Sequence, residues 1–131
     1  MGAWGLNIFS NDAALNFLHE LRESTFSSDL AAALALRDGE YIQDDEGVRA
    51  LIAAEIIASA RDGGVEEVPE RIRVLLADLP KPILKELAVA ARVAVSRVLM
   101  GSETTELRAE AGAEALVNWK QELEELMERL S

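Results

Sequence analysis

The stretch DDEGVRALIAAEIIASA, residues 44–60, joins an acidic start to apolar side chains at helical spacing. One face of the helix that it predicts carries residues spaced by three and four positions: Val48, Leu51, Ile52, Ile56 and Ser59. Asp44 or Asp45 can begin this helix, because a carboxylate is stabilised near the positive end of the helix dipole. The paired glycines at residues 63–64 predict its end.

Helical spacing continues on both sides of this stretch, and proline, glycine and serine mark the breaks between helices. We expect further helices from Ser10 or Asn11 to Leu21, from Ser27 or Ser28 to Gly39, from Pro69 to Leu79, from Pro82 to Gly101 and from Ser102 to Gly112. A last helix is expected after Gly112, with an apolar stripe formed by Leu116, Trp119, Leu123, Leu126, Met127 and Leu130. Only residues 40–43 suggest a brief extended segment. Short connections favour antiparallel neighbours, so the sequence predicts an all-α fold, a compact single-domain bundle of about six to seven helices over residues 1–131.

The composition excludes several kinds of site. The chain of 131 residues has 24 acidic and 13 basic side chains, a net charge of −11 and a hydrophobic content of 50%, which excludes disorder for most of its length. The absence of cysteine excludes disulfides, thiolate zinc sites, iron–sulfur clusters and cysteine nucleophiles. The single His19 cannot form a multi-histidine metal site. We therefore predict no cofactor.

The distribution of charge bears on the partner that this chain can bind. Residues 66–100 carry five acidic and six basic side chains, whereas the segments on either side are acidic. A negative field repels nucleic acid and anionic lipids and attracts basic proteins. The opening residues lack the basic region of a signal peptide, and Arg92 and Arg97 interrupt the apolar residues 87–100, which excludes a membrane span. We expect a cytoplasmic protein with a basic protein partner and neither nucleic acid nor membrane as partner.

The first ten residues are unusually apolar for a chain terminus. They contain two large aromatic residues and two glycines ahead of a polar pair: Trp4, Phe9, Gly2, Gly5, Asn11 and Asp12. Glycine permits backbone turns that other residues resist, so we expect residues 1–10 to fold back over the bundle as an apolar loop. The alternative is an exposed apolar hook for a partner.

The opening MGAWGLNIFSND, residues 1–12, resembles the pattern M-G-x-W-G-x-G-x-F-x-N-D, which is typical of a bacterial family catalogued as domain of unknown function 4259. Residues 53–60 and Trp119 are also similar to that family, so the resemblance covers nearly the whole chain. Asn7 replaces the usual glycine, which asparagine tolerates because it enters left-handed conformations readily. Arg108 stands where an aromatic residue is typical. The resemblance implies a small bacterial helical domain and assigns no catalytic residues.

Glu55 falls inside the apolar arc of the helix predicted over residues 44–60. A buried carboxylate costs free energy unless it is hydrogen-bonded or paired. We predict that backbone N–H groups of residues 2–5, or the Trp4 indole, donate hydrogen bonds to it. The alternative role is a general base, because burial disfavours the charged form of a carboxyl group.

A second group of carboxylates gathers before and within the start of the same helix: Asp38, Glu40, Asp44, Asp45 and Glu46. A calcium-binding loop counted from Asp38 does not match the required pattern. Ile42, Gln43 and Arg49 stand where an oxygen ligand, a glycine and a bidentate glutamate are required. We interpret these carboxylates as a solvated loop and helix start that can serve as an interaction surface. On the last helix, Glu125 and Arg129 are predicted to pair four positions apart.

Three function classes follow from these observations. The first is a non-enzymatic, acidic protein-interaction module, for example an immunity-type antitoxin that covers a basic nuclease, with binding that weakens as salt rises. The second is a small hydrolase-type or metal-dependent enzyme that uses Glu55 with Asp44, Asp45 and Glu46. The third is a self-associating helical domain in which the stripe of residues 116–130 pairs between chains. We favour the first, because the sequence contains no recognisable catalytic constellation.

Overall fold

The computed structural model describes residues 12–36, 41–62 and 68–131. These ranges form seven α-helices and one 3₁₀ turn: α2 (Asp12–Glu20), η1 (Glu23–Thr25), α3 (Phe26–Leu34), α4 (Asp44–Asp62), α5 (Glu70–Ala77), α6 (Lys81–Met100), α7 (Glu103–Glu110) and α8 (Ala113–Arg129). Within the described ranges there is no strand, and one isolated parallel bridge joins Ile42 to Ser102. The predicted all-α bundle is confirmed.

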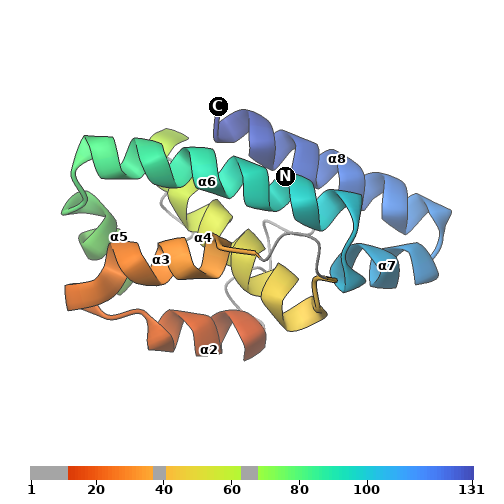
Figure 1. Ribbon diagram of the computed structural model, residues 1–131, viewed down its shortest axis with the longest axis horizontal. Coiled ribbons are helices and arrows are strands. Elements are labelled where there is room, and N and C mark those ends of the chain that lie inside the picture. Colours follow the sequence, from red (N-terminus) through yellow and green to blue (C-terminus); the bar gives the residue numbers. More distant parts are fainter. Residues whose placement is uncertain (1–11, 37–40, 63–67) are drawn as a thin grey trace.

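Helix α4 lies at the centre of the bundle and contacts each of the other six α-helices (Figure 1). Every residue from 50 to 59 is buried. The sequence predicted a single inward face for this helix, and that prediction is too narrow. A helix that is apolar on all sides is stable when neighbours cover its whole circumference, which is the arrangement of α4.

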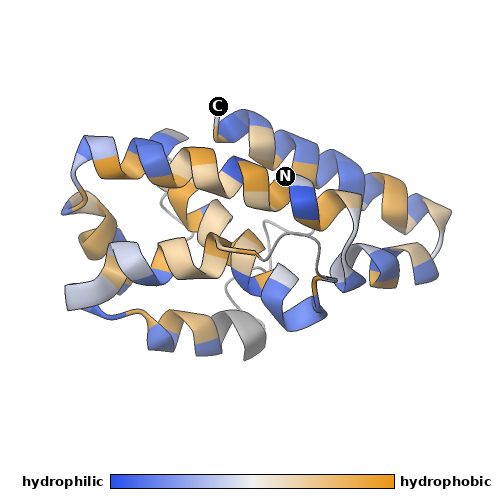
Figure 2. Cartoon of the chain, in the orientation of Figure 1, coloured by the Kyte–Doolittle hydropathy of each residue, from blue (hydrophilic) through white to orange (hydrophobic). Residues whose placement is uncertain are grey.

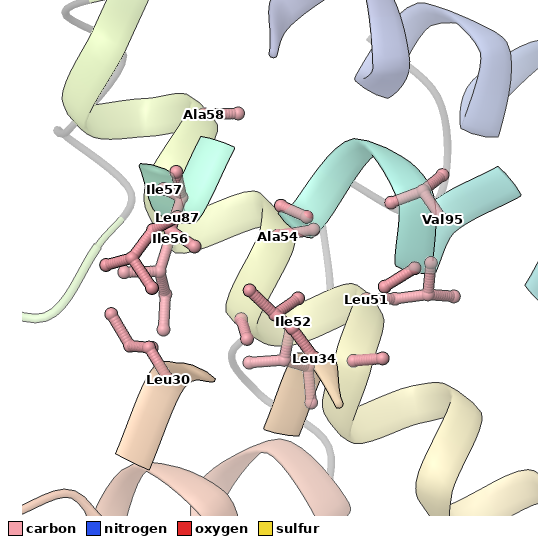
Figure 3. Packing of buried hydrophobic residues seen from close by; sticks show 14 of the residues in the cluster. Leu30, Leu34, Leu51, Ile52, Ala54, Ile56, Ile57, Ala58, Leu87 and Val95 are labelled. Carbon is pink, nitrogen blue, oxygen red and sulfur yellow. The ribbon is translucent and has the colours of Figure 1, made fainter. Parts of the chain in front are cut away.

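The packing around α4 comes largely from α3 and α6. Figure 3 shows Leu30 and Leu34 of α3 beside the side chains of α4, together with Leu87 and Val95 of α6. All four belong to one buried apolar cluster with the central residues of α4. Each fully buried leucine or isoleucine contributes about 1.5–3 kcal/mol relative to an exposed one, so this cluster is the main source of stability.

The helix breaks follow the predicted proline, glycine and serine signals. Pro82 lies in the first turn of α6, and Gly101 follows its last residue. Ser102 then caps α7, since its Oγ accepts a hydrogen bond from Thr105 N at 3.2 Å. Gly112 has a φ of 124° between α7 and α8, a backbone conformation that favours glycine.

The start of α3 differs from the prediction. Residues 27–28 lie inside the helix and do not cap it, because α3 follows directly after η1. The Asp29 carboxylate accepts hydrogen bonds from Arg22 N at 3.2 Å and Thr25 Oγ1 at 2.9 Å, so an acidic side chain of the first turn reaches back to the preceding segment. The helix is nine residues long, and the predicted extension to Gly39 is wrong.

Arginine side chains donate hydrogen bonds to backbone carbonyl groups in the last turn of α2 and after the ends of α2 and α3. Arg71 of α5 donates from Nη1 to Leu18 O at 2.8 Å and also donates to Leu21 O, after α2. Arg97 of α6 donates to Leu36 O, after α3. Leu18 O lies in the last turn of α2, where carbonyls have no partner within the helix and carry its negative dipole end, so the Arg71 guanidinium stabilises it.

The described helices separate apolar from polar residues. Figure 2 shows hydrophilic residues on the first turns of α4 and along α8, with apolar residues towards the interior. None of these helices is long and apolar enough to span a bilayer.

Candidate functional site

The structure describes only some of the residues that the sequence nominated for a site. Asp12 is the first residue of α2, whereas Glu55, Trp119 and the carboxylates of residues 44–46 lie in helices whose side chains are placed. Other nominated residues lie outside the described residues: Gly2, Trp4, Gly5, Phe9, Asn11, Asp38 and Glu40. The apolar loop of residues 1–10 and its hydrogen bonds to Glu55 therefore stay predictions.

Glu55 is buried in the middle of α4, as its place in the apolar arc predicted. Arg129, in the last turn of α8, donates from Nη1 to Glu55 Oε1 at 2.7 Å. The Glu55 side chain is 9% exposed and that of Arg129 is 33% exposed, so the pair joins a buried carboxylate to an arginine that reaches solvent. This pair compensates the buried negative charge and ties α8 to α4.

The partner of Arg129 corrects the predicted pairing on α8. The sequence assigned this arginine to Glu125, four positions earlier on the same helix, and the structure places it on Glu55. An exposed pair at this spacing is worth only about 0.3–0.5 kcal/mol. Loss of the partner of a buried carboxylate costs much more free energy than loss of such an exposed pair. The spacing rule considers one helix at a time and so cannot predict a pair between two helices.

The carboxylates proposed for an enzyme are not brought together. Glu55 lies eleven positions after Asp44 on the same helix, which is about 16 Å along its axis. Within the described ranges, no group of three or more histidine, aspartate or glutamate side chains could hold a metal ion. The described geometry around Glu55 is that of an ion pair between helices.

Trp119 is buried at the contact between α8 and α7. Its Nε1 donates to Thr105 Oγ1 at 3.0 Å, and Thr105 Oγ1 donates to Val98 O of α6 at 2.7 Å. The Arg108 guanidinium lies 4.5 Å from the centroid of the Trp119 ring, within the range of a cation–π contact. Arg108, noted above as a departure at an aromatic position, thus packs on an aromatic ring and helps to fix α7 on α8.

The N-termini of α4 and α7 meet at one end of the bundle. Glu103 N donates to Ile42 O at 2.9 Å, beside the bridge between Ile42 and Ser102. The Glu103 carboxylate in turn accepts a hydrogen bond from Asp44 N at 2.8 Å. A side chain of α7 therefore caps the first turn of α4, where a negative charge also complements the helix dipole.

Gly47 makes this close meeting of α4 and α7 possible. A Cβ atom on Gly47 would collide with Thr104 Oγ1 and would lie 3.4 Å from Thr104 Cβ. Cβ atoms essentially never come so close to another atom, so a side chain at position 47 would force Thr104 or its helix to shift.

Tyr41 stands at the edge of the same junction, with 55% of its surface exposed. Its hydroxyl donates a hydrogen bond to Glu106 of α7. This hydrogen bond, followed by burial and the negative charges of Glu106, Glu103 and Glu110, raises the pKa of Tyr41 from 10.0 to about 12. The raised pKa of the tyrosine thus comes first from its hydrogen bond to α7 and then from the negative charges of that helix.

We call the surface that results the acidic end, and define it by six carboxylates from two helices: Asp44, Asp45 and Glu46 of α4 with Glu103, Glu106 and Glu110 of α7. The sequence nominated only the α4 carboxylates. The α7 residues recur at spacings of three and four, which is a signal for one helix face. Their place beside α4 depends on tertiary packing.

A recess of about 290 Å³ adjoins the acidic end between α2, α3 and α4. Among the described residues that line it are Glu20, Asp29 and Glu46, with Arg49 as their basic neighbour. Arg49 pairs with Glu20, and its guanidinium lies 5.6 Å from the centroid of the Phe17 ring. The recess extends the acidic surface towards α2.

Comparison with known proteins gives a family for the chain and no characterised relative. No curated protein and no solved structure matches it. A family model described as "Domain of unknown function (DUF4259)" matches residues 2–122. With most of its length matched, helices α2 to α7 and the greater part of α8 included, the chain belongs to the DUF4259 family.

Proposed function

We propose that this protein is a non-enzymatic protein-interaction module and that its acidic end binds a basic surface of a partner protein. The observation that carries the proposal is that α4 and α7 each bring three carboxylates to one end of the bundle, where those of α7 lie close to an exposed tyrosine. Negative charge concentrated on one surface steers a basic partner into contact.

The construction of the acidic end supports this proposal. The Glu103 carboxylate and the Ile42–Ser102 bridge hold α4 and α7 together, so the charged surface is formed before a partner arrives. A preformed surface loses less conformational entropy on binding. Tyr41 adds an amphipathic ring of the kind that is enriched at the centres of protein interfaces.

The partner is a basic protein, bound mainly by charge. An immunity-type antitoxin, which covers the basic surface of a nuclease, is one form that such a module takes. The pairing of Glu55 with Arg129 supports a structural role for the buried carboxylate and leaves the acidic end as the surface for function.

The test compares two variants that lose the same charge at different places. The first is Asp45→Asn with Glu46→Gln and Glu110→Gln at the acidic end. The control is Glu124→Gln with Glu125→Gln and Glu128→Gln on the exposed side of α8. Each tagged protein is incubated with lysate of the source cell, washed at rising salt, and its bound proteins are identified by mass spectrometry.

We expect the unmodified chain and the α8 control to retain a stoichiometric basic protein that moderate salt releases, and the acidic-end variant to lose it. Equal retention by both variants would show that the partner does not use the acidic end. Recovery of the tagged protein alone in every case would overturn the proposal of a basic partner.

A further inference from the structure

A groove of about 600 Å³ lies between α6 and α8 and reaches the last turns of α4. Its floor is apolar and is formed by Ala88, Val89 and Val93 of α6 with Met127 and Leu130 near the end of α8. Figure 1 shows α6 and α8 side by side, running in opposite directions along one side of the bundle. The groove therefore follows the line between two antiparallel helices.

The rim of this groove is basic in a protein whose net charge is −11. Four of the 13 lysine and arginine residues line it: Arg61, Lys85, Arg92 and Arg97. No acidic side chain occurs among the described residues that line it. Lys85 and Arg92 form no hydrogen bond or ion pair with any described residue, so their charges are available to a ligand. We call this surface the cationic groove.

The floor of the cationic groove is too exposed for a small molecule to be enclosed. Val89 and Val93, one helical turn apart, are 63% and 57% exposed. A small-molecule site buries most of its ligand within concave walls. An open apolar channel between two helices is instead the type of surface on which a third, amphipathic helix packs.

We propose that the cationic groove binds an acidic amphipathic helix of a partner protein. The span from Lys85 to Arg97 on α6 is about 18 Å, which matches about three helical turns. Apolar residues on one face of the bound helix cover Val89 and Val93, and glutamate or aspartate residues on its flanks pair with Lys85 and Arg92. This surface is separate from the acidic end, and the inference does not depend on the proposed function.

Charge argues against two other occupants. The sequence of residues 1–11 contains no acidic residue, so it offers no negative charge to complement the basic rim. A second copy of this chain that used the same groove around a two-fold axis would place the basic rim of one copy against the basic rim of the other. Like charges brought together in this way oppose association.

The experiment uses a labelled synthetic peptide of about 12 residues, the length that spans the groove. The peptide has leucine at helical spacing on one face and glutamate on both flanks, and a covalent staple holds it helical because isolated helices of this length are marginal in water. A second peptide replaces each glutamate by lysine. Binding to the full chain is followed by fluorescence anisotropy.

Matched variants separate the groove from the rest of the surface. Val93→Asp places a carboxylate on the floor, and Lys85→Glu with Arg92→Glu reverses the rim. Val117→Asp is the control for the first, since Val117 is 62% exposed on α8 and does not line the groove. Lys120→Glu with Arg73→Glu is the control for the second, because both residues are exposed away from the groove lining.

We expect saturable binding of the acidic peptide and none of the basic one. Both groove variants should weaken binding by about tenfold or more, and both controls should leave it unchanged. Equal binding by Val93→Asp and the unmodified chain, or no saturable binding of the acidic peptide, would overturn the proposal. A concentration-dependent mass that Val93→Asp abolishes would assign the groove to a second copy and would also overturn it.

Discussion

The acidic end and the cationic groove are reached from opposite ends of α4, and they are built differently. At the acidic end, Tyr41 donates to Glu106, and Glu103 accepts from the backbone of Asp44, so charged groups are engaged within the protein. In the groove, Lys85 and Arg92 stand beside an exposed apolar floor. Arg61 at the groove lies 17 positions after Asp44, about 25 Å along the same helix.

The difference shows that a net charge of −11 is an average over two surfaces of opposite character. The acidic end follows the sign of the whole chain, whereas the groove opposes it. Since the two lie well beyond the distance at which mutations couple, changes at one should leave the other intact. Three substitutions and one titration, taken in order of decreasing expected effect, test how these regions are held together and whether they are independent.

Arg129→Met should cause the largest loss, because it leaves the buried Glu55 carboxylate without its ion pair between α4 and α8. We expect the free energy of unfolding to fall by about 3 kcal/mol, measured by chemical denaturation. Lys120→Met, a substitution at an exposed residue of the same helix, should lower the free energy of unfolding by less than about 0.5 kcal/mol. Equal losses in the two variants would show that the ion pair does not stabilise the packing of α8 on α4.

Gly47→Ala tests the acidic end alone. The added Cβ would collide with Thr104 Oγ1, so we expect a loss of about 2 kcal/mol in the free energy of unfolding. Thr104→Ala removes the colliding atom. In the presence of Thr104→Ala, the change at Gly47 should become neutral or stabilising, since alanine is the better helix former by about 1 kcal/mol. A loss that persists in the double variant would contradict this explanation.

Trp119→Phe keeps an aromatic ring beneath Arg108 but removes the donor to Thr105. We expect a loss of about 1 kcal/mol in the free energy of unfolding by urea denaturation. Thr105→Val removes the same hydrogen bond and also the one from Thr105 Oγ1 to Val98 O, so it should cost more. If Nε1 and Oγ1 act as a pair, the double variant should lose less than the two single losses together. Strictly additive losses would show that the hydrogen bond contributes nothing by itself.

The smallest effect is expected for the ionisation of Tyr41, which reports its hydrogen bond to Glu106 and the nearby carboxylates of α7. Its pKa of about 12 in the folded protein lies above the value of 10.0 that it has without these interactions. The stabilising contribution is therefore complete below pH 10.0 and is lost as the pH rises through about 12. The chain has one tyrosine, so tyrosinate absorbance follows this group alone.

Two variants sharpen that titration. Glu106→Gln removes the principal cause of the shift and should lower the pKa of Tyr41 towards 10.0. Lys85→Glu with Arg92→Glu changes the distant groove and should leave the titration as it is in the unmodified chain. A shift caused by the groove variant would show that the two surfaces are coupled through the bundle.

Local signals allowed much of the fold to be predicted. Proline at the start of α6, the Ser102 cap and Gly112 with its positive φ each act within a few residues, so their effect can be recognised in the sequence. The burial of Glu55 and Trp119 followed from helical periodicity in the same way. Where one polar side chain competed with another, as at the start of α3, the predicted boundary was wrong.

The sequence by itself determined that this chain forms helices, where most of them break, and one buried face of each, because those properties depend on hydrogen bonds and spacing along a single segment. Tertiary structure alone decided which segments meet. Glu55 and Arg129 are 74 residues apart in the chain, and α7 brings its carboxylates to α4 across a similar separation. Periodicity names a face of a helix but not the neighbour that covers it, so the ion pair, the acidic end and the cationic groove appear only when the helices pack.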